Sequence, residues 1–64
     1  MKNFAKVFRA RIDEKGMTIK AVAEKAGIDP RALSAMLNER QKILATDFIG
    51  LCRVLDLTPA DFEA

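Results

Sequence analysis

The chain has 64 residues, no histidine and a single cysteine, Cys52, which excludes an internal disulfide and a metal site of Cys and His ligands. This length supports one small core, so we expect one domain over residues 1–64. Residues 1–42 hold ten Lys or Arg against five acids (net +5) and residues 43–64 one Arg against four acids (net −3), so the basic part either suits a polyanion or is an ordinary solvated surface.

The first predicted helix begins after Asn3, a favoured N-cap residue, and ends at Gly16. Four apolar residues at helical spacing form its predicted buried stripe: Phe4, Val7, Phe8 and Ile12. Three charged residues are expected to point toward water: Lys6, Arg9 and Asp13. The chain therefore starts with one amphipathic helix.

Two short helices follow in close succession. The first begins after Thr18 and stops at Gly27, and its apolar stripe is Ile19, Val22, Ala23 and Ala26. Asp29 and Pro30 then supply an N-cap and a first helical position that loses no hydrogen bond, so another helix begins there and runs to about residue 38. Its buried side is predicted to be Leu33, Met36 and Leu37. Its outer side is predicted to be Arg31, Ser34, Ala35 and Asn38.

The remaining residues predict a polar loop over 39–42 and two further helices. One begins at about Leu44, with Asp47 in its first turn. Its apolar side is formed by Phe48, Leu51, Cys52 and Leu55. Thr58 and Asp61 then frame a short capped helix, from which Phe62 folds back on the core. The sequence thus predicts an all-α fold of five helices.

Residues 18–38 have the arrangement of a helix-turn-helix, two short helices joined by a tight turn that contains a glycine. Ala23 allows the helices to cross closely, and Gly27 suits a left-handed backbone at the turn. Ile28 and Leu33 supply the apolar wedge between them. With these residues and its flanking helices, the chain resembles the Cro/C1-type (XRE family) phage repressor-like DNA-binding domain, a compact five-helix fold.

The resemblance implies that the third helix, about residues 30–38, enters the major groove of DNA. Carried over by position, the residues that read base edges are Arg31, Ser34 and Ala35, whereas Pro30 occupies a usual contact position but cannot donate. Arg31 suits the O6 and N7 atoms of guanine, although an arginine on a helix surface can also pair with a neighbouring acid. Ser34 suits a base or a phosphate and Ala35 a thymine methyl group, and both are also compatible with an inert surface.

The resemblance also implies phosphate contacts by five residues: Thr18, Lys20, Asn38, Arg40 and Lys42. For Arg40 and Lys42 the alternative is a loop that is merely soluble, and for Asn38 it is a cap on its own helix. The family commonly has a phosphate-binding glutamine where this chain has Ile19, so either no residue makes that bond or Thr18 or Lys20 makes it instead. A buried Arg–Glu pair of many members is replaced by Ile12 and Leu37, and an apolar pair avoids the desolvation of charge.

These features predict a sequence-specific DNA-binding transcriptional regulator, a repressor that binds a pseudo-palindromic operator as a homodimer. Four apolar residues are candidates for the dimer surface or for plain core: Ile43, Leu44, Leu57 and Phe62. The alternative is a protein-binding module of the same fold, antitoxin-like or an adaptor whose third helix contacts protein, because Ile19, Pro30 and Ala35 make the outer face less polar than expected. Association with a protein would be nearly independent of salt, whereas DNA binding weakens steeply with salt.

An enzyme is the least favoured class. The chain has no histidine, Cys52 falls on an apolar stripe, and the neighbouring Asp13 and Glu14 point in different directions. We expect no metal, no cofactor and no small-molecule ligand. No apolar run is long enough for a bilayer, and Lys6 and Arg9 make the first residues unlike a signal peptide. A reduced, cytoplasmic setting on a bacterial nucleoid is therefore expected, for a bacterial or phage-encoded protein.

Overall fold

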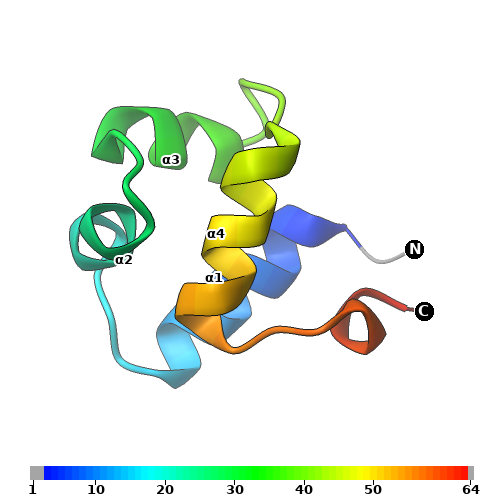
Figure 1. Ribbon diagram of the computed structural model, residues 1–64. Coiled ribbons are helices and arrows are strands. Elements are labelled where there is room, and N and C mark those ends of the chain that lie inside the picture. Colours follow the sequence, from blue (N-terminus) through cyan, green and yellow to red (C-terminus); the bar gives the residue numbers. More distant parts are fainter. Residues whose placement is uncertain (1–2, 64) are drawn as a thin grey trace.

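The computed structural model describes residues 3–63, and within them it contains helices and no strand, which confirms the predicted all-α class (Figure 1). The elements in chain order are α1 (Phe4–Glu14), α2 (Ile19–Ala26), α3 (Pro30–Leu37), α4 (Ala45–Leu55) and the 3-10 helix η1 (Pro59–Phe62). Met1, Lys2 and Ala64 belong to the predicted domain of residues 1–64 but lie outside the described residues.

Polar side chains begin the first three helices, as predicted. Asn3 Oδ1 accepts a hydrogen bond from an amide in the first turn of α1 at 3.2 Å. Thr18 Oγ1 does the same for α2 at 3.1 Å, and Asp29 Oδ1 for α3 at 3.0 Å. Each side chain satisfies an amide that has no partner within its own helix. The starts of the helices are thus encoded locally.

The last helix differs from the prediction in its type. Thr58 and Asp61 form the predicted capping box, but η1 is a single 3-10 turn rather than an α-helix. Its bonds span three residues, from the Asp61 amide to the Thr58 oxygen at 2.9 Å and from the Glu63 amide to the Ala60 oxygen at 3.3 Å. So short a segment closes more readily with such bonds than with those of an α-helix. Four α-helices and one 3-10 turn therefore replace the five predicted helices.

Two boundaries shift by one residue from their predicted places. α3 ends at Leu37, so that Asn38 is its C-cap residue rather than its last helical one. α4 begins at Ala45, and Leu44 is its N-cap residue without a capping hydrogen bond, because a leucine side chain has no acceptor. Asp47 lies in the first turn of α4 as predicted, where its charge suits the helix dipole.

The core lies between the four α-helices and is closed by η1. Its largest fully buried side chains are Phe8, Val22, Leu33, Leu51 and Leu55. The ring centroid of Phe62 lies 5.5 Å from that of Phe8 and 5.0 Å from that of Phe48, which confirms that Phe62 folds back on the core. In Figure 1, α4 crosses the middle of the molecule, with α2 and α3 on one side of it and η1 on the other.

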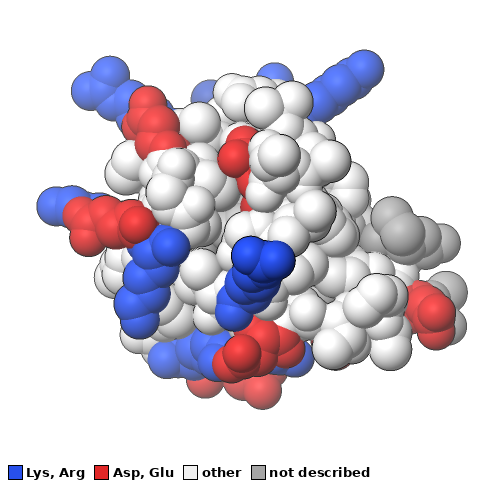
Figure 2. All heavy atoms as spheres, viewed as in Figure 1, with Lys and Arg blue, Asp and Glu red and all other residues white. Residues whose placement is uncertain are grey.

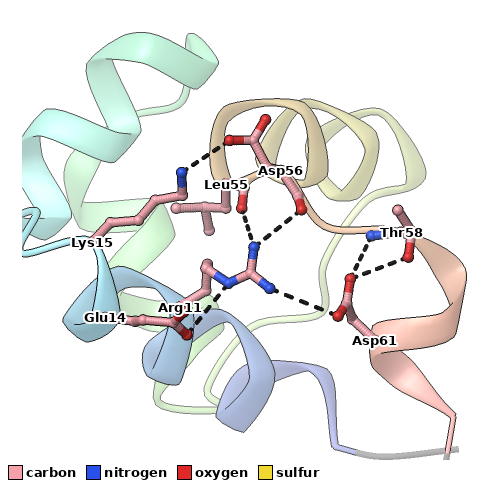
Figure 3. Close-up of polar contacts among 7 residues, drawn as sticks. All are labelled: Arg11, Glu14, Lys15, Leu55, Asp56, Thr58 and Asp61. Atoms are coloured by element: carbon pink, nitrogen blue, oxygen red, sulfur yellow. Dashed lines mark hydrogen bonds and ion pairs between the residues drawn. The ribbon is translucent and has the colours of Figure 1, made fainter.

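Arg11 on α1 binds the C-terminal end of α4 (Figure 3). Its Nη1 donates to the backbone oxygens of Leu55 at 2.9 Å and Asp56 at 3.0 Å, and its Nη2 lies 3.7 Å from the Asp61 carboxylate. Beside it, Lys15 Nζ lies 2.9 Å from Asp56 Oδ2. The last carbonyls of a helix have no partner within the helix, so an arginine fork is a suitable donor there. This group ties α1, α4 and η1 together.

Candidate nucleic-acid interface

The corner between α2 and α3 has the geometry of a helix-turn-helix. Gly27 ends α2 with a left-handed backbone, φ 71°, which a residue without a Cβ adopts most easily. Ala23 and Leu33 are wholly buried and Ile28 is 8% exposed, so an apolar contact joins the two helices. The corner therefore holds α3 against the core by one side and presents its other side to solvent (Figure 1).

The outer side of α3 carries the residues that were expected to read bases. Arg31 in the first turn is exposed and forms no ion pair with any acid among residues 3–63, so the alternative of a neighbouring acid partner is not realised there. Ser34 and Ala35 are only partly exposed. Pro30 is exposed at the start of the helix and offers no amide donor. On this face, Arg31 is therefore the residue whose guanidinium group is exposed and has no acidic partner among residues 3–63.

The expected phosphate ligands surround α3 on two segments. Thr18 and Lys20 are exposed at the start of α2, and the Thr18 hydroxyl oxygen is already used as the helix cap. Arg40 and Lys42 are exposed in the loop after α3, without ion pairs to the acids of residues 3–63. Cations thus lie on both sides of α3 along the chain, which is suitable for two stretches of DNA backbone.

Asn38 has a role that its position in the sequence did not predict. Its backbone amide donates to the Ser34 oxygen at 3.0 Å, as expected of a residue that ends a helix. Its side-chain oxygen accepts a hydrogen bond from Nη2 of Arg9 on α1, and Nε of the same Arg9 donates to the Leu37 oxygen at 3.2 Å. Arg9 is exposed, as predicted, and its guanidinium also binds the end of α3.

A notch of about 100 Å³ opens where α1, the start of α2 and the end of α3 meet. Its lining residues are Arg9, Ile12, Asp13, Ile19 and Leu37. Ile12 and Leu37 are 5% and 4% exposed and belong to the hydrophobic core. Ile19 is half-buried at the same place. Arg9 is the basic residue among those that line the notch.

Charged side chains are mixed over the face in Figure 2 rather than gathered into one basic field. Basic and acidic groups alternate around the edge of this view, and much of the surface over α4 is uncharged. The net charge of +5 in residues 1–42 therefore does not form one continuous patch on this face.

An apolar hollow lies away from α3, between α4 and η1. It measures about 380 Å³ and is lined by Phe48, Ile49, Cys52, Arg53, Leu57, Pro59 and Phe62. Ile49 is 53% exposed, and Leu44 at the start of α4 is 63% exposed. Leu57 and Phe62, in contrast, are 8% and 3% exposed and belong mainly to the core. Burial and the charge of Asp61 raise the pKa of the Cys52 thiol, which keeps it protonated at neutral pH.

The arrangement of acidic and sulfur side chains offers no metal centre in the part of the chain that the structure describes. Within residues 3–63, no group of three or more His, Cys, Asp or Glu side chains is placed to hold a metal ion. None of the helices in that range combines the length and apolar character that a bilayer span requires. The buried side-chain nitrogen and oxygen atoms of the same range all have hydrogen-bond partners.

Comparison with known proteins gives one match. A family model described as Helix-turn-helix matches residues 8–62, from within α1 to the end of η1. Searches of curated proteins and of solved structures found no match. The matched range covers most of the chain and includes the whole corner formed by α2 and α3. The chain therefore belongs to the Cro/C1-type, XRE-like helix-turn-helix family of DNA-binding regulators.

Proposed function

We propose that the protein is a sequence-specific transcriptional repressor that inserts α3 into the major groove of a pseudo-palindromic operator. The observation that carries this proposal is the exposed Arg31 in the first turn of α3, without an acidic partner among residues 3–63. In a helix-turn-helix the first residues of the second helix contact base edges. A guanidinium at this place matches the O6 and N7 acceptors of guanine.

The other contacts follow from the exposure of each residue. Ser34 and Ala35 are partly covered, so they contribute one hydrogen bond and one methyl contact at most. The proposed phosphate ligands are Thr18, Lys20, Asn38, Arg40 and Lys42, all of which are exposed. These contacts fix the position of α3 on the duplex and carry no sequence information. Acting on DNA in this way, the protein would work on the nucleoid in the cytoplasm.

A homodimer forms part of this proposal, because one small unit buries little DNA surface and a symmetric pair reads two half-sites. Leu44 at the start of α4 and Ile49 within it are exposed, and they are the better candidates for the contact. Of the other apolar candidates, Ile43 is half-buried, whereas Leu57 and Phe62 are buried in the core. The dimer contact is therefore proposed to use α4 and the hollow beside it.

A protein-binding module is the second candidate, and the same hollow favours it. An apolar surface with Ile49 exposed beside it also suits a side chain of another protein. If the partner protein binds in this hollow and not on α3, the binding strength depends little on salt, and changes on α3 leave it intact. Changes on α4 would weaken it. The two functions thus make opposite predictions for α3.

The test is a selection of bound duplexes from a randomised pool at near-physiological salt, followed by sequencing. A two-fold symmetric consensus is expected, and its half-site spacing gives the geometry of the dimer. The Arg31→Ala variant in a parallel selection is the matched control, and it should lose the preference at one position of each half-site. If the folded protein enriches no sequence, the repressor is excluded and the protein-binding module becomes the leading function.

A further inference from the structure

Arg9 and Asn38 form a pair that joins the outer surface of α1 to the end of α3. The side chain of Arg9 binds two acceptors at once, the Leu37 backbone oxygen at 3.2 Å and the side-chain oxygen of Asn38. A guanidinium group can only donate hydrogen bonds. The atom of the Asn38 side-chain amide that faces Arg9 must therefore be its oxygen, which accepts. The pair is therefore fixed in a single orientation.

The hydrogen bonds already made determine what this pair can still bind. The Nη1 group of Arg9 and the Nδ2 group of Asn38 donate to no acceptor among residues 3–63. No acid of the same range forms an ion pair with Arg9. The groups of the pair that remain unbonded are therefore mainly N–H donors, and the pair carries a net positive charge. The one acceptor left is the second lone pair of the Asn38 side-chain oxygen. Such a set matches an anion with several oxygens.

The location of the pair agrees with a ligand on the DNA backbone. Arg9 lines the notch where α1, the start of α2 and the end of α3 meet, together with Ile19 and Asp13. Asn38 leads directly into the loop that carries Arg40 and Lys42. The acid that follows Asn38 in the chain, Glu39, is held by Asn3, whose Nδ2 donates to Glu39 Oε1 at 2.6 Å. That carboxylate is therefore engaged elsewhere rather than with Arg9.

We propose that Arg9 and Asn38 together bind one phosphodiester group of the DNA backbone. This inference rests on the proposed function, because it assigns a ligand to a place beside the same interface. Arg9 also holds Asn38 in position, since it occupies the amide oxygen and leaves the amide nitrogen for the phosphate. The chemistry of the pair accepts any phosphodiester, so this contact contributes affinity without base preference.

The experiment measures duplex affinity against salt concentration for the full chain and four variants, on the selected operator and on a random duplex. Arg9→Met is expected to lower the affinity for both duplexes by about tenfold and to reduce the slope of log K against log salt by about one. Arg9→Lys keeps the charge but lacks the planar guanidinium whose separate nitrogens bind Leu37 and Asn38, so it should retain the salt slope and lose affinity. Asn38→Asp keeps an acceptor for Arg9 but removes the donor, and it should weaken binding at least as much as Arg9→Met.

Lys25→Met is the matched control, because Lys25 is an exposed cation in the last turn of α2 and lines neither the notch nor the outer side of α3. Its salt slope should equal that of the unchanged protein. Thermal unfolding of each variant shows that the differences do not come from loss of the fold. If the unchanged protein binds DNA and Arg9→Met or Asn38→Asp binds equally well, the phosphate site is refuted while the repressor stands. If the unchanged protein binds no duplex even at low salt, both proposals fall.

Discussion

The guanidinium of Arg11 donates to the backbone oxygen of Leu55 at 2.9 Å, across 44 positions of sequence. The same guanidinium also donates to the backbone oxygen of Asp56. An arginine on α1 thus provides hydrogen-bond donors for the carbonyl groups at the C-terminal end of α4. The Arg11 side chain is only 23% exposed, so water does not easily replace it when it is removed. We expect Arg11 to be more important for stability than the other surface cations.

The first prediction is that Arg11→Met lowers the free energy of unfolding by about 1.5–3 kcal/mol, the usual loss for hydrogen bonds that involve a charged group. Urea unfolding measures it. Arg11→Lys should recover only part of the loss, because an ammonium group lacks the planar fork. The control is Glu14→Gln, since the Glu14 side chain is 74% exposed and such ion pairs contribute little. Equal effects of Arg11→Met and Glu14→Gln would contradict the role of Arg11 at α4.

The second prediction compares two glycines. Gly27 has φ 71°, and a Cβ there meets no atom within 4 Å, so Gly27→Ala suffers only from the left-handed backbone and should destabilise by about 1 kcal/mol. Gly50 lies within α4, and its Cβ would lie 3.6 Å from the Ala26 oxygen, an ordinary contact. Gly50→Ala should therefore stabilise by about 0.5–1 kcal/mol. In thermal denaturation, Gly27→Ala should have a lower midpoint than the unchanged protein and Gly50→Ala a higher one. Midpoint shifts of the same sign in both variants would contradict this prediction.

Most of the fold was predictable because its signals are local. Asn3, Thr18 and Asp29 are caps, and they act on amides within three residues of themselves. The left-handed turn at Gly27 and the buried stripes follow from residue type and spacing alone. The sequence predicted a short helix after Thr58 but did not distinguish a 3-10 turn from an α-helix, because that choice depends on how few residues form the segment.

The candidate site was less predictable, because its contacts join distant segments. The bonds of Arg9 to Leu37 and Asn38 cross 28 and 29 positions of sequence. No pattern in α1 distinguishes Arg9 from a solvent-exposed cation such as Lys6. One signal was available, namely that Ile19 lacks the family's polar side chain, which could have prompted a search for a substitute cation. The proposed DNA contacts of Arg31 and Ser34 remain predictions.

The third prediction concerns pH. The hydrogen bond and charge of Lys15 lower the pKa of Asp56 below its ordinary value. A lowered pKa in the folded state means that the ionised carboxylate stabilises the fold above the unfolded-state pKa, and that this contribution disappears as pH falls below about 4. Asn tolerates the left-handed backbone of Asp56, φ 55°. Thermal midpoints of Asp56→Asn and the unchanged protein should thus differ slightly at pH 7 and converge at lower pH. A difference that grows on acidification would be the opposite of this expectation.

The fourth prediction separates base reading from phosphate binding. Arg31→Ala should relax the preference at one base pair and cost about 1–3 kcal/mol on the operator, with little change on random DNA. Lys42→Ala should weaken binding to both duplexes alike and flatten the salt dependence by about one unit of slope. Fluorescence anisotropy titrations on both duplexes measure these effects. Equal losses of preference in the two variants would overturn the division of roles.

The fifth prediction concerns Asp13, whose carboxylate lines the same notch as Arg9. If a phosphate binds there, Asp13→Asn removes a repulsive charge and should raise DNA affinity about threefold at low salt. Glu63→Gln is the control, because it changes the net charge equally at a residue beyond η1. Equal gains in both variants would indicate a general charge effect with no special role for the notch.

The apolar hollow beside η1 contains the single thiol of the chain, so the rate of thiol modification can be used to follow this part of the molecule. Cys52 lines that hollow together with Pro59 and Phe62, and its side chain is partly exposed. Because the raised pKa leaves little thiolate at neutral pH, modification by a maleimide or disulfide reagent should be slow. The rate of thiol labelling would then report whether the hollow is open or covered, at a position removed from α3. Operator DNA should leave this rate unchanged in a monomer and reduce it where a second copy covers α4.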